Sequence, residues 1–177
     1  MEILLGVSAS AACFKAAALA SQLVKAGHGV TAVLSTGATR LVTPLQFSCL
    51  TGRPTLSDEW KPEDPAGMDH IQLARRADAV LLVPATADRI ASVAHGLAGD
   101  LLGSTLLAVE VEKPRIAAPS MNPEMWRQPA VQRNVAQLAA DGWQYVGPVA
   151  GLTACGEDGL GRMAEVEDIL AAVQALS

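Results

Sequence analysis

Short, uniformly apolar segments alternate along the chain with longer segments in which small apolar and polar residues mix. The apolar segments over residues 3–7, 30–34, 79–83, 115–118 and 143–146 are predicted to be strands. Strands that lack a polar face are buried on both sides, which is typical of a parallel sheet covered by helices. Strand–helix–strand units with right-handed crossovers predict an α/β fold, a Rossmann-like (flavodoxin-type) parallel sheet with helices on both faces.

The segments between these strands are predicted to be helical. We expect helices over residues 11–26, 44–50, 70–76, 88–109, 128–141 and 166–176. Gly27 would end the first of them, because glycine readily adopts the left-handed conformation that follows a helix. Residues 51–68 contain several prolines and acidic residues and are expected to form an exposed loop. No repeat or long linker divides the chain, so we expect one domain over residues 1–177.

Composition and charge narrow the class of protein. The net charge of -5 argues against a nucleic-acid or anionic-membrane surface. No apolar run reaches the ~20 residues of a membrane span, and the N-terminus does not have the pattern of a signal peptide. Cys13, Cys49 and Cys155 lie far apart and outside any C-x-x-C spacing. Neither a metal site nor a disulfide is therefore expected, and a cytoplasmic location is indicated. The apolar neighbours of Cys13 and Cys49 predict two buried, inert thiols.

The candidate chemistry is expected beyond the carboxyl ends of the strands, where open parallel sheets bind ligands. Ser8 and Ser10 follow the first predicted strand, and Ser35 follows the second. The first turn lacks the glycine spacing of a dinucleotide fingerprint and no acidic residue follows the second strand, which favours a mononucleotide over NAD. Ser8 and Ser10 either seat a phosphate at a helix N-terminus or act as ordinary caps.

Three later features each have two interpretations. The segment Pro119-Ser120-Met121-Asn122-Pro123-Glu124-Met125-Trp126 is either the start of a helix whose methionines fill core gaps or an apolar lid that aims Asn122 at a ligand. Residues 151–163 include four glycines and are predicted to be a mobile loop. Cys155 in this loop is either a reactant that moves into a site or an incidental surface thiol. His70, at a predicted helix start, is either a base or a histidine satisfied by backbone groups.

These segments together resemble the homo-oligomeric flavin-containing cysteine decarboxylases, more narrowly the branch that acts on phosphopantothenoylcysteine in coenzyme A synthesis. The similarity runs in order through nearly the whole chain. It is carried by Gly6-Val7-Ser8 with Lys15, Thr43-Pro44-Leu45-Gln46-Phe47, His70-Ile71-Gln72-Leu73-Ala74, Pro84-Ala85-Thr86-Ala87-Asp88, the segment from Pro119 to Trp126, Ala154-Cys155-Gly156 and Gly161-Arg162-Met163.

The resemblance implies FMN as the cofactor and a small molecule as the substrate. In this family the flavin oxidises a cysteine moiety to a thioaldehyde, CO2 leaves, and an enethiolate remains. The coenzyme A enzymes then return the electrons, with the loop cysteine as proton donor. The resemblance places FMN on Ser8, Ser10, Ser35, Ala85, Thr86 and Met121, with its phosphate near the first two serines.

The resemblance also assigns the catalytic and substrate-binding residues. His70 would be the base and Cys155 the proton donor, while Asn122 would hold the substrate carboxylate or amide beside Met121 and Met125. Asp88 is placed with the substrate-binding residues, although many members carry Asn at this position, and Arg89 follows it in place of Thr. The family implies a homo-oligomer, a trimer or a dodecamer. Two alternatives stay open: a decarboxylase of a peptidyl C-terminal cysteine and a non-catalytic flavin-binding regulatory subunit.

Overall fold

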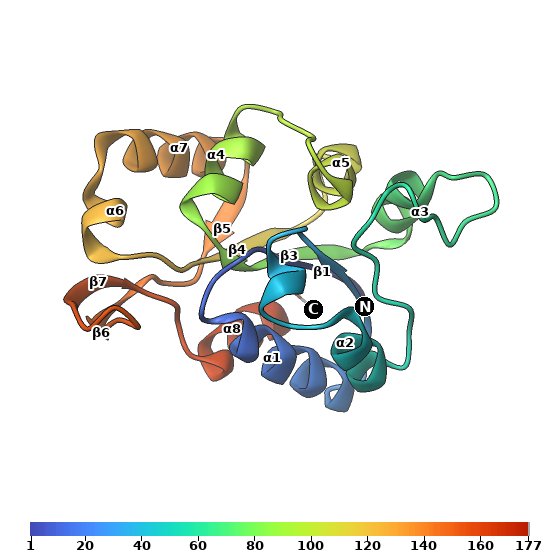
Figure 1. The fold of residues 1–177 in the computed structure, drawn as a ribbon, viewed down its shortest axis with the longest axis horizontal. Coiled ribbons are helices and arrows are strands. Elements are labelled where there is room, and N and C mark those ends of the chain that lie inside the picture. Colours follow the sequence, from blue (N-terminus) through green and yellow to red (C-terminus); the bar gives the residue numbers. More distant parts are fainter. Residues whose placement is uncertain (177) are drawn as a thin grey trace.

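A five-stranded parallel sheet forms the centre of the protein in the computed structural model, which describes residues 1–176 (Figure 1). The strands are β1 (Glu2–Val7), β2 (Gly29–Leu34), β3 (Ala79–Ala85), β4 (Arg115–Pro119) and β5 (Trp143–Tyr145). Their order is β2-β1-β3-β4-β5, and each neighbouring pair is parallel. This is the strand order of flavodoxin-like sheets. The five predicted strands and the predicted fold class are confirmed.

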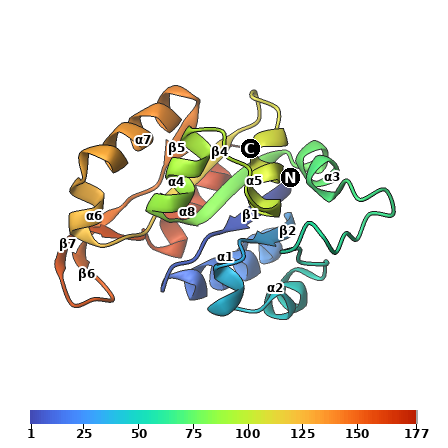
Figure 2. The ribbon, with the colours of Figure 1, turned by 45° about the horizontal axis from the view of Figure 1, so that its top comes forward.

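Helices cover both faces of the sheet (Figures 1 and 2). The helices are α1 (Cys13–Lys25), α2 (Pro44–Thr51), α3 (Asp69–Arg76), α4 (Ala87–Ala94), α5 (Leu101–Ala108), α6 (Pro123–Arg127), α7 (Pro129–Ala140) and α8 (Val166–Gln174), with a 3-10 turn, η1 (Ala38–Arg40). Along β1, Ile3, Leu5 and Val7 pack in the core with α1 and α8, while Leu4 packs in the second core with α3, α4, α5 and α7. The apolar strands are thus buried on both sides, as their composition predicted.

The single helix predicted over residues 88–109 is wrong, because the structure has α4 and α5 in its place. Gly96, with φ of 65°, lies just beyond the end of α4. Asp100 begins the next helix, since its side chain accepts a hydrogen bond from the Gly103 amide at 2.8 Å. Gly96 and Asp100 mark the break in the sequence as a helix end followed by an N-cap, and the prediction relied on the apolar residues around them instead.

The mobile loop predicted over residues 151–163 is also wrong. β6 (Val149–Leu152) and β7 (Asp158–Arg162) form an antiparallel hairpin that is separate from the central sheet, and Cys155 lies in its turn. The Met121 amide donates to the Gly161 carbonyl at 3.0 Å. A Cβ at position 161 would collide with the Met121 carbonyl oxygen, so this glycine permits close packing of the hairpin.

The two thiols predicted to be buried behave differently. Cys13 is buried, and burial raises the pKa of its thiol, whereas Cys49 is exposed on α2. The expectation for Cys49 is wrong because Phe47 points into the core, and a residue two positions further along a helix lies on another face. Within residues 1–176, the structure has no helix long and apolar enough to cross a membrane and no cluster of side chains suited to hold a metal ion.

Candidate active site

The ends of β1 and β3 meet where the strand order reverses, which is the place where sheets of this type bind their ligands. Ser8 joins the two strand ends: its hydroxyl donates to the Pro84 carbonyl at 2.6 Å and accepts from the Thr86 amide at 3.0 Å. Ser8 is only 2 % exposed. The helix that follows, α1, begins at Cys13, so neither serine is its N-cap, although the Ser10 hydroxyl accepts from the Ala12 amide at 3.2 Å. Ser8 therefore links the end of β1 to the end of β3 at the base of the site.

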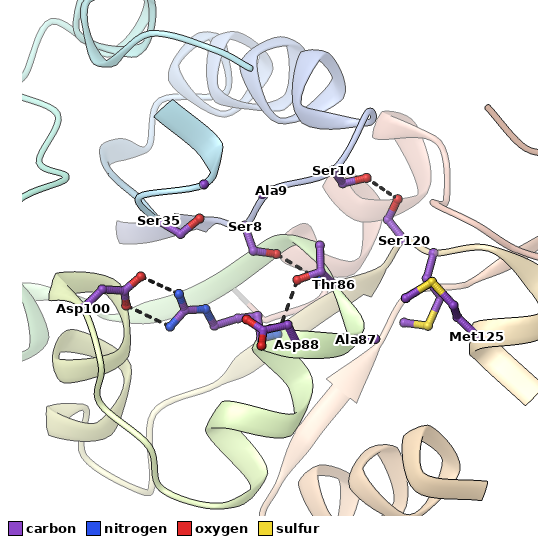
Figure 3. A pocket seen from close by; sticks show the side chains of 13 residues that line it. Ser8, Ala9, Ser10, Ser35, Thr86, Ala87, Asp88, Asp100, Ser120 and Met125 are labelled. Atoms are coloured by element: carbon purple, nitrogen blue, oxygen red, sulfur yellow. Dashed lines mark hydrogen bonds and ion pairs between the residues drawn. The ribbon is translucent and has the colours of Figure 1, made fainter. Parts of the chain in front are cut away.

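A cavity of about 530 Å³, which we call the sheet-edge pocket, opens at this point (Figure 3). The sequence-predicted residues that line it are Ser8, Ser10, Ser35, Thr86, Asp88, Met121 and Met125. Ala85 is fully buried at the end of β3, where its carbonyl accepts from the Ser120 amide. Ser120 was quoted in a motif but given no role, although its hydroxyl lies 2.8 Å from that of Ser10 and lines the pocket. The structure thus brings together most of the residues that the sequence assigned to the cofactor.

An ion pair that the sequence did not reveal lies in the wall of the sheet-edge pocket. Arg89 donates from both terminal nitrogens to the two carboxylate oxygens of Asp100, at 2.9 and 2.6 Å. Arg89 is 7 % exposed, and its Nε has no hydrogen-bond partner among the described residues. Arg89 lies in α4 and Asp100 caps α5, so only the packing of these two helices brings the two side chains together.

A second cavity, the hairpin pocket, adjoins the first and measures about 440 Å³. The two pockets share Ser10, Ser120 and Met121. Asn122 and Cys155 lie in the hairpin pocket, together with residues of α1 and of the β6–β7 hairpin. A molecule in the hairpin pocket would therefore lie next to a molecule in the sheet-edge pocket.

Asn122 and Cys155 are in contact. The Asn122 amide nitrogen lies 3.2 Å from the Cys155 sulfur and 2.8 Å from a Glu157 carboxylate oxygen, while its amide oxygen caps α6. The Thr153 hydroxyl lies 3.0 Å from the same sulfur. Hydrogen bonds from Thr153, from Asn122 and from the backbone at Glu157, in that order, hold the pKa of the Cys155 thiol below its usual value. The structure therefore brings Asn122 and Cys155 to one place, while the roles expected of them stay predictions.

Lys15 adds a positive charge to the hairpin pocket, and the sequence gave it no role beyond its place in a motif. Its ammonium group lies 2.8 Å from a Glu165 carboxylate oxygen and donates to the carbonyls of Met163 and Ala164. Lys15, followed by Arg162, holds the pKa of Glu165 below its usual value. These contacts join α1 to the segment that follows β7.

His70 does not join this site within one chain. It lies at the start of α3, at the opposite end of the molecule from the β6–β7 hairpin in both views (Figures 1 and 2), and it lines neither pocket. The reason is topological, because α3 leads into the amino end of β3, whereas Asn122 and Cys155 follow the carboxyl ends of strands. The site residues predicted from the sequence are therefore divided between two separate places.

Comparison with known proteins places the chain in a family. A model of the family described as Flavoprotein matches residues 1–177. The chain belongs to the flavoprotein family. Among its relatives, the probable phosphopantothenoylcysteine decarboxylase of Streptococcus mutans is 38 % identical over 173 residues, which cover 98 % of this chain and 97 % of that protein. The coenzyme A biosynthesis bifunctional protein CoaBC of Bacillus subtilis is 41 % identical over 169 residues, and the chain spans only 41 % of its length.

Solved structures of similar proteins have the same fold as this flavoprotein. A cysteine-to-serine mutant of PPC decarboxylase complexed with pantothenoylaminoethenethiol has a TM-score of 0.87 and 29 % identity, over 99 % of this chain and 97 % of that one. The FMN-dependent cysteine decarboxylase SpaF has a TM-score of 0.83 and 31 % identity, over 100 % and 98 % of the two chains. The resemblance to flavin-containing cysteine decarboxylases is therefore confirmed.

Proposed function

We propose that this flavoprotein is an FMN-dependent phosphopantothenoylcysteine decarboxylase of coenzyme A synthesis, which converts 4′-phosphopantothenoylcysteine into 4′-phosphopantetheine and CO2. The contact between Asn122 and Cys155 in the hairpin pocket, next to the sheet-edge pocket, carries the proposal. It places an amide donor and a thiol of lowered pKa at one position beside a nucleotide-sized cavity. The names of the relatives, which include a probable phosphopantothenoylcysteine decarboxylase that matches 98 % of the chain, support the same activity.

The sheet-edge pocket fits FMN. Its volume of about 530 Å³ lies within the usual range of ~300–1,000 Å³ for pockets of small ligands and cofactors. Ser10, Ser35, Ser120 and Thr86 line it with hydroxyl groups, and the Nε of Arg89 is a buried donor that lacks an acceptor. Hydroxyls and a cation in the wall suit the phosphate, ribityl and carbonyl oxygens of a flavin mononucleotide. We assign FMN to Ser8, Ser10, Ser35, Thr86 and Met121, which line the pocket, whereas Ala85, predicted with them, is fully buried and does not line it.

Each of the predicted catalytic residues is given one role in the reaction, with His70 supplied by a neighbouring chain. Bound FMN would supply the two-electron oxidation of the substrate's cysteinyl group and return both electrons after CO2 has left. His70 takes the proton of the substrate thiol, and the Asn122 amide orients the carboxylate that departs. Cys155 then gives its proton to the carbon from which CO2 left, a role that suits a thiol whose pKa is held low by hydrogen bonds. Met125 and Asp88 border the substrate.

The site needs a second copy of the chain if His70 is the base. We propose a cytoplasmic homo-oligomer, a trimer or dodecamer, in which His70 of one chain reaches the pockets of its neighbour. Exposed apolar side chains support a buried interface, and they include Trp60 at 85 %, Leu45 at 71 % and Phe14 at 66 % exposure. Three free thiols in the described chain are consistent with a reducing compartment.

Anaerobic mixing of the yellow holoenzyme with phosphopantothenoylcysteine tests the activity directly. We expect CO2 release together with a transient loss of flavin absorbance, because the electrons return to the product. Bound FMN without bleaching or CO2 would overturn the proposal in favour of a peptidyl cysteine substrate or a regulatory role.

The Cys155→Ser variant tests the proton donor. It should still release CO2, but its flavin should stay reduced and the oxidised product should accumulate. Full turnover to 4′-phosphopantetheine by this variant would exclude Cys155 as the proton donor.

A further inference from the structure

A third cavity, of about 160 Å³, lies away from both pockets of the candidate active site, at the amino ends of β4 and β5. The helices α4, α5 and α7 contribute to its walls. Its lining is mostly apolar and includes Leu97, Leu106, Leu107, Val111, Leu138 and Trp143. Leu97, Leu107 and Val111 are themselves exposed, so the cavity opens to solvent through an apolar rim. We call it the Arg115 cavity, after the one cation in its lining.

Arg115 is a buried cation without a counter-charge. It is 8 % exposed, and no carboxylate within residues 1–176 lies within ion-pair distance of its guanidinium group. Nη1 donates to the Asp141 carbonyl at 3.3 Å, and Nη2 donates to the carbonyls of Glu110 at 2.8 Å and Val109 at 3.5 Å. Nε is buried and has no acceptor among the described residues. Because a guanidinium stays charged, its burial with carbonyl partners alone is costly, and an anion would relieve that cost.

The remaining groups around the cavity do not neutralise Arg115. Asp141 is the one acidic side chain in the lining, and it is exposed, with its carboxylate accepting from the Gln137 amide at 2.9 Å. Arg115 also stands in a strand that is otherwise apolar, where its charge contributes nothing to sheet formation. A buried cation in an apolar cavity is the arrangement that recognises a molecule with one negative charge and an apolar body.

We propose that the Arg115 cavity binds a small monocarboxylate with a branched aliphatic or single-ring tail. The carboxylate would lie on the guanidinium group of Arg115, whose planar N–H groups match carboxylate geometry. The tail would lie among Leu97, Leu107 and Val111. A cavity of roughly 150 Å³ accommodates a benzene-sized molecule, so the tail has about the size of one ring. A single cation matches one negative charge, which favours a monocarboxylate over a phosphate dianion.

The Arg115 cavity is separate from the site of the proposed reaction. Gly103 lines the cavity, and a Cβ at this position would lie 3.1 Å from the Leu97 carbonyl oxygen and 3.2 Å from Arg89 Nη1. The Arg89–Asp100 pair thus stands between the cavity and the sheet-edge pocket. The bound carboxylate is therefore neither the substrate nor the flavin.

Calorimetric titration of the FMN-loaded protein with benzoate tests this site, with benzamide as the neutral analogue of the same shape. We expect benzoate to bind at least about tenfold more tightly than benzamide, since only the anion pairs with Arg115. Arg115→Met should weaken benzoate binding by at least about tenfold. Lys25→Met removes an exposed cation on α1, at the other face of the sheet, and should leave the affinity unchanged. Failure of benzoate to bind, or equal binding by Arg115→Met, would overturn the proposal.

A pair of variants at the rim keeps the test informative if Arg115→Met does not fold. Val111 is 75 % exposed, so its replacement leaves the core intact. Val111→Glu places a competing carboxylate at the cavity and should abolish benzoate binding, whereas Val111→Gln should retain it. The mass of the oligomer should be the same in both variants. A smaller oligomer in Val111→Glu would show that this rim is a contact between chains, which would overturn the ligand site.

Discussion

The Asn122 amide nitrogen donates to the Cys155 sulfur at 3.2 Å, and the amide oxygen of the same side chain caps α6. Asn122→Asp keeps the capping oxygen but replaces the donor by a negatively charged acceptor, so the thiolate of Cys155 loses a stabilising hydrogen bond. The pKa of Cys155 should therefore rise, and less thiolate should be present at any given pH. Alkylation by iodoacetamide, measured in a Cys49→Ser background, should shift to higher pH.

Asn134→Asp on α7 is the matched control for this change, because it adds the same charge away from the thiol. Its alkylation profile should coincide with that of the Cys49→Ser parent. An unshifted profile in Asn122→Asp would mean that the amide does not set the reactivity of Cys155.

Mixed oligomers test whether two chains share one site. His70→Asn and Cys155→Ser should each abolish complete turnover on its own. When the two variants are mixed at equal amounts and reassembled, about a quarter of the sites would combine an intact pocket with an intact neighbouring His70, on random association. We expect 4′-phosphopantetheine formation to return to about that fraction of the wild-type rate. Complete absence of recovery, in mixtures shown to contain both chains, would place His70 in the site of its own chain.

The packing of the hairpin depends on Gly161, where a side chain would collide with the backbone at Met121. Gly161→Ala should destabilise the protein by about 1–3 kcal/mol, because backbone cannot move aside as a flexible side chain can. It should also return the pKa of Cys155 toward its usual value by displacing the turn. Urea unfolding and thiol alkylation measure the two effects. Gly99→Ala, where no atom lies within 4 Å of the added carbon, should show neither.

Removing the negative charge of Asp100, which pairs with Arg89, should lower the free energy of unfolding of the FMN-free protein. Asp100→Asn retains an oxygen to cap α5 but leaves the buried guanidinium without a counter-charge, so we expect a loss of about 3 kcal/mol in the free energy of unfolding. Urea denaturation gives the value. Asp58→Asn, in the exposed pair with Lys61, should change it by less than about 0.5 kcal/mol. Equal effects of the two substitutions would contradict a structural role for the buried pair.

The sequence was sufficient to predict the central strands, whose residues are buried on both faces of the sheet. The central strands are apolar throughout because both of their faces are buried, which is the pattern of strands in a parallel sheet covered by helices. The hairpin escaped prediction because β7 contains two glycines and only one apolar side chain, Leu160, so it lacks the apolar alternation of a half-buried strand. The break between α4 and α5 was missed for another reason: Gly96 and Asp100 mark it, but the apolar residues on both sides favoured one continuous helix.

The sequence predicted the candidate-site residues that lie in recognisable motifs, but not the contacts that form only when distant segments pack together. Asn122 and Cys155 were assigned to one site from a family resemblance, and the structure brings them into contact. The Arg89–Asp100 pair could not be foreseen, because residues on two helices pair only after the helices have packed. The separation of His70 from Cys155 depends on which end of a strand each segment joins, and this is a property of the topology rather than of either motif.

The β6–β7 hairpin forms a two-stranded sheet of its own, and the thiol that we assign as the proton donor lies in its turn. The sheet-edge pocket, by contrast, is formed by segments that follow the central strands. The flavin, which would serve both halves of the proposed reaction, and the final proton donor are thus held by different stretches of the chain. The turn that holds Cys155 can consequently change during evolution and alter the final product, provided that Gly161 keeps its packing against Met121.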